Sequence, residues 1–182
     1  MGLALAKEAY IRGADLTLVA ANVSVEIPSL FNVIHVETSS EMNEVILRLV
    51  PDFDIFISTA AVSDFEFKKK DDKIDSNSSL FLNLKPTTKI IRQVKKINPD
   101  IFLVGFKAEF NISQDEIIAC ARKQIEQAGT DLVIANDISK NDCHLGSDNN
   151  EVLIVDDEVL AIPLASKREI AKIIFDVISK KF

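Results

Sequence analysis

The segment that most constrains the fold is residues 54–59, where Ile55, Phe56 and Ile57 are consecutive apolar residues. Successive side chains of a strand point to opposite faces, so this strand would be apolar on both faces. Strands of that kind are typical of parallel sheets that are covered by helices on both sides. Similar short apolar runs occur at residues 16–20, 33–36, 101–105 and 131–135. The sequence therefore predicts a mostly parallel sheet.

Segments with helical periodicity separate these runs. Helices are predicted from Leu3 to Arg12, from Ser39 or Ser40 to about Leu49, from Thr87 or Thr88 to about Ile97, from Gln114 to Ala128 and from Ser166 to Lys180. Two short runs, 151–155 and 158–162, flank Asp156-Asp157 and predict a hairpin. Strands joined by helices imply right-handed crossovers. We predict an α/β fold: a three-layer α/β/α, Rossmann-like domain, residues 1–182, with a C-terminal β-hairpin and a closing helix.

Composition excludes several classes of function. The net charge of −7 argues against a general nucleic-acid binder, which needs a basic face. No apolar run is long enough for a transmembrane helix, and the N-terminus lacks the basic, apolar and cleavage regions of a signal peptide, so we expect a cytoplasmic protein. Cys120 and Cys143 have no CxxC spacing, which excludes a recognisable zinc site. The five glycines form neither GxGxxG nor a Walker A loop, so neither phosphate-binding loop is predicted.

Three polar clusters follow predicted strands. Asp64 comes after the 54–59 run and the small residues Ala60 and Ala61, residues 105–109 follow a second strand, and Asn136-Asp137 follows a third. Ligands of open parallel sheets bind at the carboxyl ends of the strands, where these clusters would meet. A basic segment ending at Lys73 follows the first cluster and would suit a polyphosphate. The residues alone therefore predict an anion or nucleotide site at this edge.

Each of these residues also has a purely structural interpretation. Asp64 would bind a metal ion or a ribose hydroxyl, or else cap a turn, and Lys73 would otherwise be a solvated lysine. Phe106 would stack on a base or belong to the core. Asn136 and Asp137 would bind a ligand or form an Asx-turn, and Lys107 and Glu109 would form a surface ion pair.

Six ordered motifs carry a resemblance to a known family. They are Ala60–Phe65, Lys73–Ile74, Lys85–Ile90, Gly105–Glu109, Ala135–Asp137 and Ser147–Val152. Together they resemble the phosphopantothenate–cysteine ligase domain of coenzyme A biosynthesis, over essentially the whole chain. That resemblance implies ligation of 4′-phosphopantothenate to cysteine through an acyl-nucleotide, with CTP expected rather than ATP, and with Mg²⁺. It also implies a homodimer, and a fused decarboxylase domain that binds FMN outside this chain.

The resemblance also implies roles for individual residues. Asp64 and Lys73 match the catalytic positions, with Asp64 at the nucleotide and Lys73 on a flap over it. Further nucleotide-binding positions match Ala60, Ala61, Pro86, Thr87, Thr88, Lys89, Phe106, Lys123 and Gln127. Asn136 and Asp137 match the substrate side, whereas no ligand of the metal ion is indicated.

The sequence departs from the family pattern at three places. Asp75 and Ser76 stand where many members have a second flap lysine, and Gln127 stands where many have a second helix lysine. The family's domain begins with a strand and an Asn-Arg-Ser-Ser-Gly-Lys loop that leads into Met-Gly. Met1-Gly2 matches the end of that loop, so the usual N-terminal strand and loop are expected to be missing here. A nucleotide-binding or dimerisation module without complete catalytic machinery is the alternative hypothesis.

Overall fold

The computed structural model describes residues 1–66, 83–144 and 146–182. Its largest sheet is mixed and has five strands. In spatial order they are β3 (Ile55–Ser58), β6 (Phe102–Glu109), β7 (Leu132–Asp137), β8 (Asn149–Val155) and β9 (Val159–Ser166). β3, β6 and β7 are parallel, and β8 and β9 form the predicted antiparallel hairpin at the edge. The predicted α/β fold with mostly parallel strands is confirmed.

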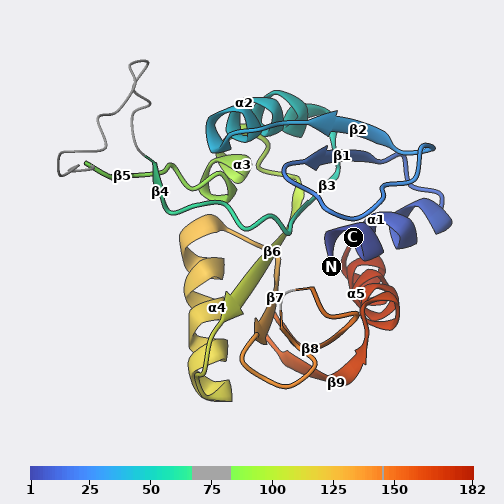
Figure 1. Cartoon of the computed structure of the whole chain (residues 1–182), viewed down its shortest axis with the longest axis vertical. Helices are drawn as coiled ribbons and strands as arrows, with labels where there is room; N and C mark the ends of the chain where they lie inside the picture. Colours follow the sequence, from blue (N-terminus) through green and yellow to red (C-terminus); the bar gives the residue numbers. More distant parts are fainter. Residues whose placement is uncertain (67–82, 145) are drawn as a thin grey trace, which may run out of the picture.

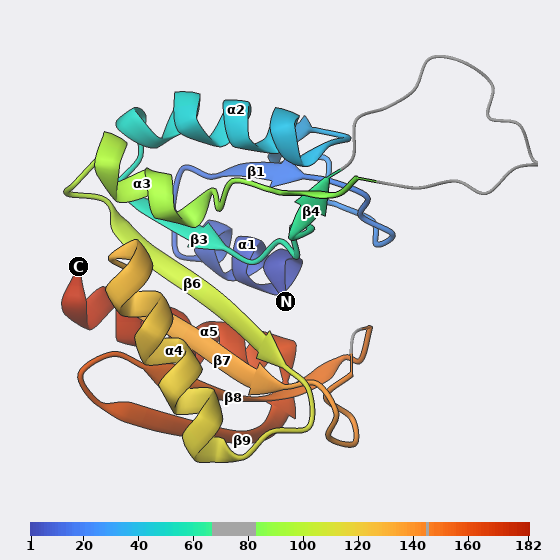
Figure 2. The ribbon, with the colours of Figure 1, turned by 90° about the vertical axis from the view of Figure 1, so that its left-hand side faces the viewer.

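Two short ladders accompany this sheet. β1 (Thr17–Ala20) pairs with β2 (Asn32–His35) in parallel, and β4 (Phe65–Glu66) pairs with β5 (Lys85–Pro86) in antiparallel. The helices are α1 (Gly2–Ile11), α2 (Ser39–Leu49), α3 (Ile91–Ile97), α4 (Gln114–Ala128) and α5 (Lys167–Lys181), with a 3₁₀ turn over Val50–Asp52. α4 lies on one side of β6 and β7, and α1 and α5 lie on the other, as Figures 1 and 2 show. The three predicted layers are therefore present.

The strands of the sheet are apolar on both faces, as their sequences predict. On β7, Leu132 and Ile134 pack in the cluster that contains α5, whereas Val133 and Ala135 pack in the cluster that contains α4. All four side chains are fully buried. This alternation is the expected consequence of a strand's two-residue period.

Local sequence sets several helix ends. Ser113 and Ser166 cap α4 and α5, each as part of a capping box with a glutamate three residues later. Gly13 follows α1 with a φ of +83°, and its N–H donates to the carbonyl of Tyr10 while the N–H of Ala14 donates to that of Ala9. This is a Schellman motif, for which glycine is the least strained residue.

Helix α3 starts at Ile91 and not at Thr87 or Thr88. The reason is a long-range pairing: the N–H of Thr87 donates to the carbonyl of Asp64, and its hydroxyl donates to the carbonyl of Ser63 at 2.5 Å. These bonds continue the β4–β5 ladder and keep Thr87 in an extended segment. The predicted helix start is therefore wrong.

Strands β6 and β7 are longer than the sequence indicates. They pair up to Glu109 opposite Asp137, so the predicted polar clusters are the last residues of the strands and not the loops after them. Both clusters still lie at the carboxyl edge, where the arrowheads of β6 and β7 lie together in Figure 2. Among the described residues, no helix is both long and apolar enough to span a membrane.

Candidate functional site

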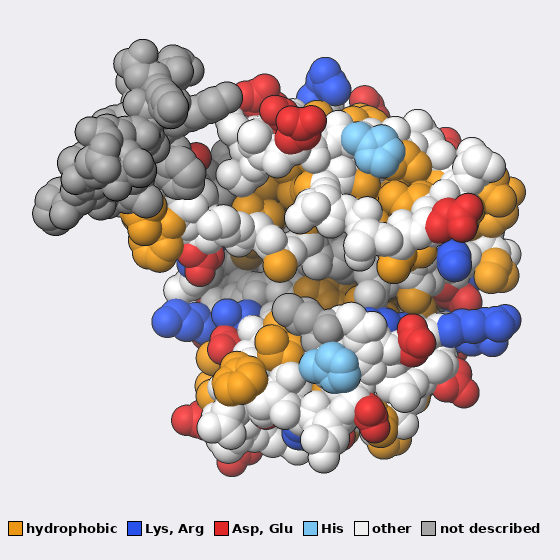
Figure 3. Space-filling model, in the orientation of Figure 1, with side chains coloured by type: hydrophobic (Ala, Val, Ile, Leu, Met, Phe, Trp, Pro, Cys, Tyr) orange, Lys and Arg blue, Asp and Glu red, His pale blue; other side chains and the backbone are white. Residues whose placement is uncertain are grey.

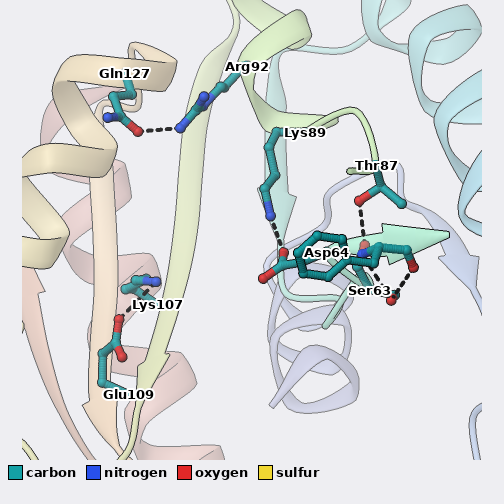
Figure 4. Close-up of polar contacts among 9 residues, drawn as sticks. Ser63, Asp64, Thr87, Lys89, Arg92, Lys107, Glu109 and Gln127 are labelled. Carbon is teal, nitrogen blue, oxygen red and sulfur yellow. Dashed lines mark hydrogen bonds and ion pairs between the residues drawn. The ribbon is translucent and has the colours of Figure 1, made fainter. Parts of the chain in front are cut away.

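The segment after β3 is hydrogen-bonded to the segment before α3. Ser63 donates its hydroxyl to the carbonyl of Phe65 at 2.8 Å, and the Thr87 bonds join the two segments directly. Figure 4 shows these contacts beside β4. Ala60 and Ala61 lie exposed in the same segment. The sequence elements that were predicted to bind a nucleotide, 60–64 and 86–89, are thus neighbours although more than 20 residues separate them.

Asp64 forms an ion pair with Lys89 across this junction. The carboxylate projects towards β6, with the lysine ammonium directly above it in Figure 4. The hydrogen bond from Lys89 and its charge lower the pKa of Asp64, and the charge of Lys107 lowers it further. Asp64 therefore stays ionised at neutral pH and does not act as a proton donor there.

β6 presents different side chains to its two faces. Lys107 and Glu109 lie on the face covered by α3 and α4, with the Lys107 Nζ 2.9 Å from Glu109 Oε1, so the predicted ion pair is present. Phe106 lies on the other face, half-buried against the cluster that contains α1 and α5. If Phe106 stacks on a base, it does so on the face of β6 opposite Lys107, and this role stays a prediction.

Helices α3 and α4 meet over Gly105. A Cβ at that position would lie 2.0 Å from the Gln124 amide nitrogen, so glycine provides the space that this side chain occupies. Beside it, Arg92 of α3 donates to the side-chain oxygen of Gln127 of α4. Lys123 lies one turn before Gln127 on the same helix and is exposed. Arg92 and Gln124 were not predicted, because no local sequence pattern indicates which helices contact each other.

The end of β7 contains the predicted substrate residues. Asn136 donates its side-chain amide to Asn150 Oδ1 at 3.2 Å, and Asn150 is buried. Asp137 Oδ1 accepts the N–H of Ser139 at 2.8 Å and that of Asn111 at 3.0 Å. Hydrogen bonds from Ser139, and a further one from the backbone of Asn111, lower the pKa of Asp137. The Asp137 carboxylate thus forms the Asx-turn, and Asn136 with Asn150 forms an amide pair at the edge.

A hollow crosses one face of the molecule in Figure 3, between α3 above and α4 below. Lys and Arg side chains gather over α4 at its left-hand end, and an acidic side chain lies above them. Acidic side chains also lie directly below them, so this end of the hollow carries side chains of both charges. Lys73 lies outside the described residues, and Thr88 is exposed at the same edge as Lys89.

The described residues contain no group of three or more His, Cys, Asp or Glu side chains that could hold a metal ion. Mg²⁺ commonly keeps several waters and is bound by one or two carboxylates together with substrate phosphates. An exposed, ionised carboxylate such as Asp64 fits that mode of binding, whereas it does not form a metal cage by itself.

Comparison with known proteins identifies the family. A family model described as "DNA/pantothenate metabolism flavoprotein C-terminal domain" matches residues 1–182. The chain belongs to this family. The family resemblance predicted from the six motifs is thereby confirmed.

The curated relatives of this DNA/pantothenate metabolism flavoprotein domain are longer proteins. The coenzyme A biosynthesis bifunctional protein CoaBC of Thermococcus kodakarensis is 47% identical over an alignment of 185 positions that covers 99% of this chain and 44% of that protein. The protein of the same description from Methanocaldococcus jannaschii is 34% identical, again over 99% of this chain and 44% of its own length. The chain therefore spans less than half the length of these relatives.

Solved structures share the fold of this family member. The DNA/pantothenate metabolism flavoprotein from Streptococcus pneumoniae has a TM-score of 0.84 at 22% identity, covering 98% of this chain and 86% of that one. The C-terminal domain of CoaBC has a TM-score of 0.79 at 24% identity, covering 98% and 80%. A Cab2 mutant in complex with phosphopantothenate–cysteine has a TM-score of 0.74 at 16% identity, covering 98% and 76%. At these identities the likeness concerns the fold.

Proposed function

We propose that residues 1–182 form a single ligase domain that joins 4′-phosphopantothenate to cysteine in coenzyme A biosynthesis. The observation that carries this proposal is the family match over the whole chain. The names of the CoaBC relatives and of the Cab2 complex agree with it. The charged site at the carboxyl edge supplies the matching chemistry, since both the nucleotide and the acid substrate are anions.

The proposed reaction has two steps. A carboxylate oxygen of phosphopantothenate attacks the α-phosphorus of CTP, and the bond to pyrophosphate breaks. The cysteine nitrogen then attacks the carbonyl carbon, loses a proton and displaces CMP to form the amide. Both steps bring together groups of like charge or release an anion, so positioned cations lower the barrier.

Individual residues support this chemistry in different ways. Lys89, which Asp64 holds at the edge, and the flap lysine Lys73 would offset the charge of the triphosphate. Asp64 would bind the ribose or serve as the carboxylate ligand of Mg²⁺, which neutralises phosphate charge when it is bound. The Asn136–Asn150 pair, 3.2 Å apart, offers amide groups to the polar chain of phosphopantothenate.

The proposal is tested by incubating the 182-residue chain with CTP or ATP, 4′-phosphopantothenate and cysteine. Pyrophosphate release and the amide product, identified by mass spectrometry, should require all three substrates, with CTP preferred. Lys73→Gln should slow turnover while leaving the unfolding midpoint unchanged, and Lys180→Gln is the control. No release with either nucleotide, from this chain or from the full-length protein that contains it, contradicts the ligase assignment. Binding of CTP without turnover supports the binding-module alternative.

The assembly is part of the same proposal. We expect a cytoplasmic homodimer, acting without nucleic acid or membrane, alongside a decarboxylase domain that binds FMN in the full-length protein. Light scattering of the purified chain tests the dimer, and a monomeric mass contradicts it. Residues 1–182 alone should be colourless, because flavin absorbance belongs to the other domain.

A further inference from the structure

Two lysines from separate elements lie on the Asp64 side of the carboxyl edge. Lys89 reaches the Asp64 carboxylate from the segment before α3 and forms the ion pair described above. Lys107 lies on β6, where its ammonium pairs with Glu109, and its charge adds to the lowering of the Asp64 pKa. Figure 4 shows Lys89 directly above the Asp64 carboxylate, which projects towards β6, and Lys107 beside Glu109 across that strand. The carboxyl edge therefore carries two neighbouring lysine–carboxylate pairs, Lys89 with Asp64 and Lys107 with Glu109.

Each lysine forms an ion pair with a carboxylate that another anion can displace. Lys107 Nζ lies 2.9 Å from Glu109 Oε1, and their side chains are 38% and 27% exposed. Lys89 and Asp64 are more exposed still, at 45% and 67%. Exposed ion pairs contribute little net stability, so they are broken at little cost. A phosphate group carries more charge and more acceptor oxygens than a carboxylate, and it forms stronger hydrogen bonds to both lysines.

We propose that Lys107 and Lys89 form a two-lysine clamp for a phosphate group of a polyphosphate ligand, with Glu109 and Asp64 as the counter-ions that pair with the two lysines before a ligand binds. When the ligand binds, both ammonium groups donate hydrogen bonds to the phosphate oxygens. Asp64 is then free to bind the ribose or Mg²⁺. Lys107 is thereby a ligand-binding residue, and its pair with Glu109 is its resting state. This inference rests on the proposed nucleotide chemistry and names the phosphate subsite within it.

Inorganic pyrophosphate without magnesium is the probe, titrated calorimetrically into the 182-residue chain. Lys107→Gln should weaken binding about tenfold, the usual scale for a charge-assisted hydrogen bond, and Lys107→Arg should restore most of it. Glu109→Gln should tighten binding about threefold, because it removes a competing anion at a cost typical of an exposed pair. Lys181→Gln is the matched control, since Lys181 is 40% exposed and lies 2.7 Å from Asp156 at the other end of the sheet.

The opposite signs separate a clamp from a structural ion pair. If Lys107→Gln and Glu109→Gln both weaken binding and lower the unfolding midpoint, the pair is structural and the clamp is wrong. Equal effects of Lys107→Gln and Lys181→Gln also overturn it, because they indicate only a general charge effect. Wild-type protein that binds neither pyrophosphate nor CTP contradicts the proposed function itself. Wild-type binding that Lys107→Gln leaves within twofold overturns the clamp alone.

Discussion

Gly105 offers a quantitative test of the packing that forms the floor of the site. Replacing it with alanine adds a Cβ 2.0 Å from Gln124 Nε2 and 3.2 Å from both Gln124 Cδ and Ile91 Cδ1. The amide nitrogen must withdraw by about 1 Å to reach even 3.0 Å, the shortest separation that real Cβ atoms show. Gly105→Ala therefore forces Gln124 to leave its position between α3 and α4.

The cost follows from two opposing effects. Inserting a methyl group into a filled space costs about 1–3 kcal/mol. Alanine in a strand is favoured over glycine by about 0.5–1 kcal/mol, since glycine loses more backbone entropy on folding. The flexible end of Gln124 can move, so the net destabilisation should lie near 1 kcal/mol, towards the lower end of that range.

A double-mutant cycle isolates the Gln124 contact. Gly105→Ala is measured in the wild type and in Gln124→Ala, from the urea dependence of the circular dichroism signal. Without the glutamine amide, Gly105→Ala should be neutral or slightly stabilising, which gives a coupling free energy of about 1 kcal/mol. Equal destabilisation in both backgrounds would refute the reasoning, because the methyl group would then be clashing with something other than Gln124.

Three further predictions concern the frame around the site. Arg12→Met removes the bond to the buried Glu8 at 2.9 Å and the ion pair with Asp176 of α5 at 2.6 Å, and should lower the free energy of unfolding by about 2 kcal/mol; a loss under 0.5 kcal/mol in urea titrations contradicts this. Ser113→Ala removes the cap of α4 and should cost about 1 kcal/mol by the same measurement; an unchanged midpoint means that the cap is dispensable. The Asp137 carboxylate, whose pKa is lowered, stabilises the fold at neutral pH, and this contribution is lost as the pH falls from about 5 through its folded pKa. Asp137→Asn should lose less stability than the wild type over that range, and identical pH profiles would contradict the role.

Local sequence was sufficient for most of the fold. The apolar runs at β3, β6 and β7 predict strands because both of their faces are buried, and the serines before α4 and α5 mark true helix starts. The start of α3 was not predictable, because Thr87 is held extended by bonds to residues more than 20 positions away. Pairing between neighbours likewise extends β6 and β7 beyond their apolar runs.

The sequence was enough to predict which edge of the sheet carries the site, but not which side chains contact each other there. Parallel strands must end together, so Asp64, Lys107 and Asn136 could be placed at one edge from their positions in sequence. Which of them touch depends on side-chain reach across the edge: the Asp64–Lys89 pair and the Arg92–Gln127 bridge join elements 25 and 35 residues apart. No local pattern encodes such a partner.

We propose that a nucleotide binds at the carboxyl edge of β3, β6 and β7. Chemical-shift mapping of the ¹⁵N-labelled chain during a CTP titration shows directly which residues the nucleotide affects. We expect the largest shifts at the amides of residues 60–64, 87–89 and 105–107. Shifts centred instead on residues 30–32, which line a small pocket beside the C-terminal end of α1, or no shifts at all, would contradict it.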